Sequence, residues 1–115
     1  MTTTSLTRKT SEEIDAVLGE LRAGLEELYG GRLRGLYLYG SYARGDARPG
    51  SDVDVLVVLD AVESYSSEIQ RTSQRRAEVA LRHDVSISLM YVSEDAWIRG
   101  EMPILQNARR EGRAA

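Results

Sequence analysis

Two aspartates in the middle of the chain, Asp52 and Asp54, have the type and spacing of a metal site. They open a segment, 52–59, whose other residues are all Val or Leu, which predicts a β-strand. Because side chains alternate along a strand, the two carboxylates share one face, about 7 Å apart after two steps of rise. Their charges repel each other unless a cation lies between them. Carboxylate oxygens favour Mg²⁺, and the chain has no cysteine for a softer metal.

A second segment, just before these aspartates, has the composition of a phosphate site. The strand predicted for 33–39 leads into Gly40 and Ser41, followed by a short helix predicted for 41–44. Without a side chain at Gly40, backbone N–H groups can approach a phosphate, and the Ser41 hydroxyl can donate to it. Arg44 is a candidate to bind the same phosphates. A phosphate site beside paired carboxylates indicates phosphoryl or nucleotidyl transfer.

The whole motif carries a family resemblance. Gly40-Ser41-Tyr42-Ala43-Arg44-Gly45 followed by Ser51-Asp52-Val53-Asp54 resembles the signature of the polymerase-β-like nucleotidyltransferase superfamily, and the short chain resembles its minimal nucleotidyltransferase (MNT) branch. The resemblance implies an α/β fold with a small mixed β-sheet of three to four strands flanked by helices. It also implies a nucleotide bound by Gly40, Ser41, Arg44 and Ser51. The plainer alternative is a strand-turn-strand corner with two solvated aspartates.

The resemblance further implies a third carboxylate on a neighbouring strand, which binds the catalytic metal and takes the proton from the attacking hydroxyl. Asp84 matches this position because it opens the segment 84–92, which is predicted to be the third strand. Ser86 and Ser88 would share its face. Alternatively, Asp84 only begins a strand or caps the preceding turn. With Asp84 and the two motif aspartates as ligands, the resemblance implies two Mg²⁺ ions and ATP as the substrate.

The family resemblance implies a partner as well as a reaction. Members of the MNT branch resemble antitoxins encoded beside HEPN-domain toxins, so the expected reaction is transfer of AMP to a toxin tyrosine, with release of pyrophosphate. Another polypeptide or a second copy of the chain would supply the acceptor half of the site. Two alternatives remain open. One is a noncatalytic antitoxin that acts by binding, and the other is an aminoglycoside-type nucleotidyltransferase with a small-molecule acceptor.

Helices are predicted around these strands. A capping box, Thr10 with Glu13, begins a helix that Gly30-Gly31 ends, and a second helix falls within 63–81. Ser93 caps a short helix that contains Trp97, and a final helix is predicted for 102–111.

Composition narrows the class of protein. The 115 residues predict a single domain, 1–115, with residues 1–9 loosely ordered, and the resemblance implies that it is a nucleotidyltransferase domain. The net charge of −3 argues against direct nucleic-acid binding. No apolar run has the length of a membrane span, no signal peptide is evident, and cysteine is absent, so a cytoplasmic protein is expected.

Overall fold

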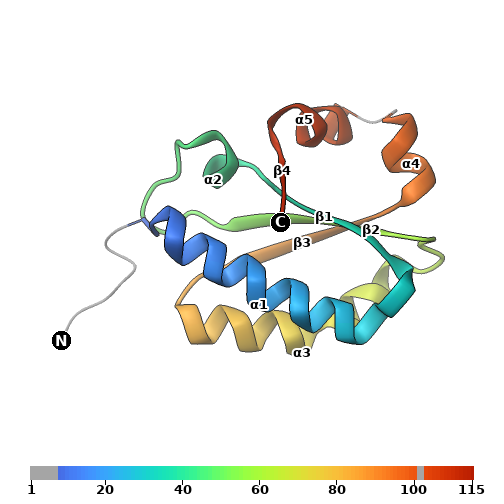
Figure 1. Cartoon of the computed structure of the whole chain (residues 1–115), viewed down its shortest axis with the longest axis horizontal. Coiled ribbons are helices and arrows are strands. Elements are labelled where there is room, and N and C mark those ends of the chain that lie inside the picture. Colours follow the sequence, from blue (N-terminus) through green and yellow to red (C-terminus); the bar gives the residue numbers. More distant parts are fainter. Residues whose placement is uncertain (1–7, 101–102) are drawn as a thin grey trace.

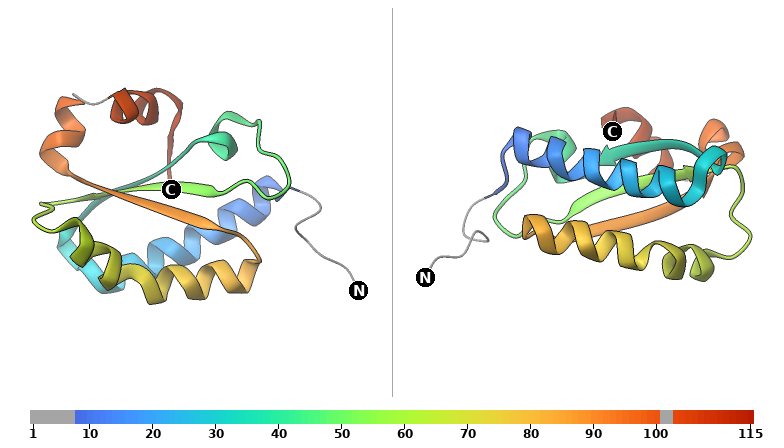
Figure 2. Two further views of the ribbon diagram at one scale, coloured as in Figure 1. Left: turned by 180° about the vertical axis from the view of Figure 1, so that it is seen from behind. Right: turned by 60° about the horizontal axis from the view of Figure 1, so that its bottom comes forward.

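The computed structural model describes residues 8–100 and 103–115. A four-stranded sheet has the order β3-β2-β1-β4, in which β2 and β3 are parallel and the other pairs are antiparallel. Helices α1 and α3 lie side by side on one face, and α4 and α5 lie over the other (Figures 1 and 2). The elements in chain order are α1 (Ser11–Tyr29), η2 (Gly30–Arg32), β1 (Leu33–Tyr39), α2 (Ser41–Arg44), β2 (Val53–Leu59), α3 (Tyr65–His83), β3 (Ile87–Ser93), α4 (Glu94–Arg99), α5 (Pro103–Glu111) and β4 (Arg113–Ala114). This confirms the predicted mixed sheet flanked by helices.

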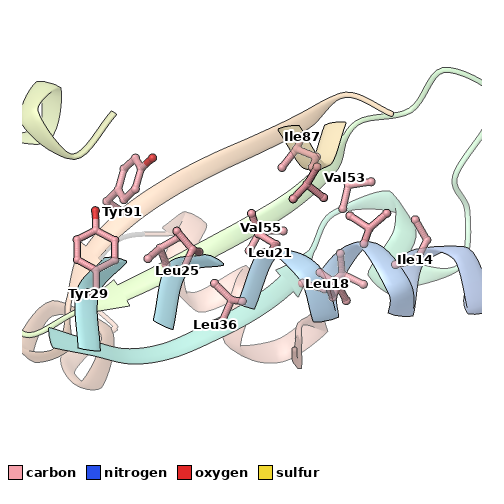
Figure 3. Packing of buried hydrophobic residues seen from close by; sticks show 14 of the residues in the cluster. Ile14, Leu18, Leu21, Leu25, Tyr29, Leu36, Val53, Val55, Ile87 and Tyr91 are labelled. Carbon is pink, nitrogen blue, oxygen red and sulfur yellow. The ribbon is translucent and has the colours of Figure 1, made fainter. Parts of the chain in front are cut away.

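Helix α1 begins as its sequence predicts. The Glu13 backbone N–H donates to the Thr10 hydroxyl at 3.1 Å, and the Thr10 N–H donates to the Glu13 carboxylate at 2.8 Å. This reciprocal capping box satisfies N–H groups that have no partner within the helix. The apolar stripe of α1 then lies buried on the sheet, as Figure 3 shows for Leu18, Leu21 and Leu25.

The central strand β2 is buried on both faces, so it carries two sets of core side chains. Val53, Val55 and Val57 pack toward α1 and α3, whereas Leu56 and Val58 pack with residues of α4 and α5. Side chains alternate along a strand, so Asp54 lies on the same face as Leu56. Asp54 therefore lies on the face covered by α4 and α5, near the N-terminal end of β2.

A short strand near the C-terminus was not predicted. Backbone pairs join β4 to β1 at Tyr37↔Ala114 and Leu38↔Arg113. Gly112 precedes this strand, and a Cβ there would overlap the carbonyl oxygens of Ala108 and Leu38. The glycine therefore allows the chain to turn from α5 onto the sheet.

The predicted start of the third strand is wrong. The strand begins at Ile87, and Asp84 is the C-cap of α3 in the left-handed region, with φ 52°. Its N–H donates to the carbonyl oxygens of Ala80 and Leu81. The backbone of Asp84 therefore agrees with the alternative stated above, in which this residue caps the preceding turn and does not begin a strand.

Two other expectations reach beyond the described residues. The predicted loose order of 1–9 falls on 1–7, which lie outside them, as does Met102 in the predicted final helix. Within the described ranges, no helix is long and apolar enough to cross a membrane.

Candidate active site

The antiparallel pairing of β1 with β2 brings the two halves of the motif together. Tyr39 at the end of β1 pairs with Asp54 near the start of β2, so the next residue, Gly40, lies beside the Asp54 side chain. A Cβ at residue 40 would overlap Asp54 Oδ2. The backbone at Gly40, with φ 76° and ψ −156°, is in a region that is essentially restricted to glycine. Gly40 thus provides both the turn and the space for the carboxylate.

The predicted short helix after Gly40 is confirmed. The Gly40 carbonyl accepts from the N–H groups of Ala43 and Arg44 at 3.1 and 3.0 Å, which closes the first turn of α2. Gly45, at φ 83°, ends the helix, and its N–H donates to the Ser41 carbonyl at 3.0 Å. Ser41 is consequently held at the first position of α2, next to the glycine that contacts Asp54.

The two aspartates differ in their surroundings. Asp52 is exposed and precedes β2, whereas Asp54 is partly buried. Burial raises the pKa of Asp54, the charge of Asp52 raises it further, and Arg44 opposes both effects. A cation between the carboxylates would relieve this repulsion. The donor set fits Mg²⁺, an ion that is usually bound by one or two carboxylates together with water and substrate phosphates.

The last residue of α2 and the loop that follows it carry the remaining predicted binding residues. Arg44 is half exposed and donates from Nε to Asp46 Oδ2 at 3.3 Å. The Ser51 hydroxyl accepts from the Arg48 N–H at 2.8 Å, and the Ser51 N–H donates to the Arg48 carbonyl at 2.9 Å. Ser51 therefore stabilises the turn that precedes Asp52, and binding of nucleotide by Ser51 and Arg44 stays a prediction.

The structure does not bring Asp84 into a three-carboxylate set. Its side chain is exposed at the end of α3. Across 8–100 and 103–115, no group of three or more Asp, Glu, His or Cys residues is placed to hold a metal ion. The left-handed turn at Asp84 breaks the strand alternation on which the prediction depended.

Sequence reasoning missed the residues that lie beside Asp54. Tyr39 is its partner in β1, and Ser88 is its partner in β3. Burial and the charge of Asp54 raise the pKa of Tyr39. The strand register shows that Tyr39 and Ser88 are neighbours of Asp54. A single sequence does not specify this register, so it could not identify them.

Comparison with known proteins gives the family. The nucleotidyltransferase domain family matches residues 18–110. Protein adenylyltransferase MntA of Thermococcus cleftensis is 36% identical over 76 residues, which are 66% of this chain and 75% of that protein.

Solved structures show the same fold. A chain of a toxin-antitoxin complex with AMP-PNP matches with a TM-score of 0.60 and 20% identity, over 84% of this chain and 69% of that chain. A chain from the complex of tri-AMPylated Shewanella oneidensis HEPN toxin with MNT antitoxin matches with a TM-score of 0.53 and 17% identity, over 90% of this chain and 68% of that chain. The family match spans most of the chain, and the strand pairing unites the motif's glycine turn with its aspartates, so this chain belongs to the nucleotidyltransferase domain family.

Proposed function

We propose that this nucleotidyltransferase transfers AMP from ATP to a hydroxyl group of another protein, a tyrosine of a HEPN-domain toxin, in a Mg²⁺-dependent reaction. The observation that carries the proposal is the contact between the backbone of Gly40 and the carboxylate of Asp54. This contact supports the proposal because it brings the candidate phosphate-binding turn next to Asp54, one of the two candidate metal ligands. Transfer of a nucleotide needs both in one place.

The reaction forms a bond between the acceptor oxygen and the α-phosphorus. The bond from that phosphorus to the β-phosphate bridging oxygen breaks, pyrophosphate leaves with the bonding electron pair, and the acceptor proton passes to water. Mg²⁺ held by Asp52 and Asp54 would offset the negative charge of the triphosphate. Gly40 and Ser41 would orient the phosphates, and Arg44, whose positive charge acts on Asp54, would add positive charge at the site.

Two relatives support a protein acceptor. The Thermococcus cleftensis relative is a protein adenylyltransferase, and the Shewanella oneidensis complex contains an AMPylated HEPN toxin bound to an MNT antitoxin. These are properties of those proteins, and we extend them to this chain on the basis of the shared family and fold.

The test is transfer of label from ATP to a purified HEPN-domain toxin. Label at the α-phosphate should appear on the toxin, and label at the γ-phosphate should appear in pyrophosphate. The D52A/D54A variant should lose transfer by about a thousandfold or more, because several kcal/mol of charge stabilisation depend on the metal site. The control E12Q/D15N removes two exposed carboxylates from α1, and it should transfer AMP at the wild-type rate.

Three results would contradict the proposal. Unchanged transfer by D52A/D54A would show that these acids do not form the site. Neutralisation of the toxin without pyrophosphate release would indicate an antitoxin that acts by binding. Release of pyrophosphate with label on a small hydroxyl compound, and none on the toxin, would indicate a small-molecule enzyme.

A further inference from the structure

Three side chains form a row across the sheet at the candidate active site. Tyr39 of β1 pairs with Asp54 of β2, and Asp54 pairs with Ser88 of β3. The next row in β2 and β3 pairs Leu56 with Met90, and both belong to the core cluster under α4 and α5. Paired residues in a sheet point to the same side, so Ser88 and Asp54 share this face.

Strand β3 therefore presents a hydroxyl, and no carboxylate, beside Asp54. Ser88 is exposed, and Ser86, two residues earlier, is exposed as well. The Ser86 carbonyl accepts from the Val53 N–H at 2.8 Å, so the chain is already in register with β2 at that point. Asp84 lies before this paired segment, in the left-handed cap of α3.

The position of Asp84 agrees with this register. Asp84 is exposed at the end of α3, and within residues 8–100 and 103–115 no third acid is placed to hold a metal ion with Asp52 and Asp54. Two carboxylates with the phosphates of a nucleotide complete the shell of one Mg²⁺, which also keeps several waters. A second ion about 3.5–4 Å away needs further anionic ligands.

We propose that the nucleotide site of this chain holds a single divalent ion, and that Ser88 stands where a third carboxylate would bind a second one. The proposal rests on the proposed function, since it concerns the same site. It follows that no carboxylate of β3 removes the proton of the acceptor hydroxyl.

The test counts bound Mn²⁺ by electron paramagnetic resonance, with the full chain in excess over a non-hydrolysable ATP analogue whose α and β phosphorus atoms are joined by a methylene group. The wild type and D84N should each bind one ion per nucleotide. The S88D variant should bind two, because it adds the missing carboxylate beside Asp54. The control S73D adds the same charge to an exposed position on α3, across the sheet from the row, and should bind one.

The outcomes separate this inference from the proposed function. Two ions in the wild type would overturn the single-ion site, and loss of one of them in D84N would assign the third ligand to Asp84. One ion in a folded S88D variant, as judged by circular dichroism, would overturn the placement of Ser88. If S88D does not fold, the wild-type and D84N counts still decide the number of ions. Failure of the wild type to bind any ion or nucleotide would overturn the proposed function as well.

Discussion

At the scale of single residues, the contact between Gly40 and Asp54 links backbone geometry to chemistry. The carboxylate occupies the space that a side chain at residue 40 would need, and the turn has a conformation that other residues rarely adopt. Asp54 is thereby held at the turn while its own ionisation is opposed by burial and by Asp52. The ionised carboxylate of Asp54 therefore lowers the stability of the fold, and a cation bound there would reduce this cost.

We predict that G40A destabilises the protein by about 1–3 kcal/mol and abolishes nucleotide binding, since it adds backbone strain and displaces the Asp54 carboxylate. Urea unfolding and fluorescent nucleotide titration measure the two effects. The matched control is G45A, which also has positive φ, at 83°, but whose Cβ would meet nothing within 4 Å. G45A should lose about 1–2 kcal/mol from strain and keep nucleotide binding. Equal loss of binding in both variants would show that strain alone is responsible.

Replacing Asp54 with asparagine should stabilise the metal-free protein while removing activity. The pKa of Asp54 is raised on folding, so the unfolded chain ionises first as the pH rises, and the folded state loses stability until the pH passes the folded pKa. D54N should therefore unfold at a higher temperature than the wild type at pH 7 in EDTA. The difference should shrink as the pH falls through about 4, near the ordinary aspartate pKa, and vanish about one unit lower, where both states are protonated. A lower melting temperature for D54N at pH 7 would contradict this electrostatic account.

At the scale of elements, the helices and strands of this chain were largely predictable, because capping residues and apolar periodicity are local signals. The capping box of α1, the glycines that end it, and the strand-turn-strand order around Gly40 are all present. The error at Asp84 has a physical reason, since a polar residue at a helix end and one at a strand start look alike in sequence. The positions of Ser88 and β4 depend on strand register and pairing, which are tertiary.

The packing of α1 on α3 includes a buried acid whose loss should be costly. Glu68 is 4% exposed, accepts from the Tyr29 hydroxyl at 2.6 Å, and forms an ion pair with Arg32 at 3.3 Å. Burial and this hydrogen bond raise the pKa of Tyr29, so the phenol stays a donor in alkaline solution as well as at neutral pH. We predict that E68Q lowers the free energy of unfolding by about 1.5–3 kcal/mol, the range for hydrogen bonds to charged groups.

Urea unfolding of E68Q measures this loss, with E78Q on the exposed face of the same helix as the control. The control should change stability by less than about 0.5 kcal/mol. Similar losses in both variants would show that charge on α3 matters, irrespective of burial.

At the scale of the whole molecule, the candidate nucleotide site and the ion pairs of Arg32 with Asp60 and Glu68 lie at opposite ends of the sheet. Tyr39 and Asp54 pair at one end of the β1–β2 hairpin, and Leu33 and Leu59 pair at the other, beside the Arg32–Asp60 ion pair. The long helices α1 and α3 run along one face between these ends (Figure 1). Perturbing the Glu68 end should consequently change stability and leave the nucleotide site intact.

Ligand binding should stabilise the whole fold. A nucleotide analogue with Mg²⁺ at about 100 times its dissociation constant adds about 2.7 kcal/mol to the free energy of unfolding. For a domain of this size, the melting temperature should rise by roughly 10 °C or more. Thermal unfolding with and without EDTA measures the shift, which should disappear in D52A/D54A. A shift that persists in EDTA would show that the analogue binds without a divalent ion.

The overlap at residue 40 also sets an order in which substitutions can accumulate as a lineage diverges. A side chain at residue 40 is excluded twice, by the backbone conformation and by the neighbouring carboxylate. A homologue that no longer needs catalysis can replace Asp54 with a smaller residue in a single step. Only after that replacement is there room for a side chain at residue 40. Descendants that have lost the glycine should already have lost the aspartate, and those that keep the aspartate should keep the glycine.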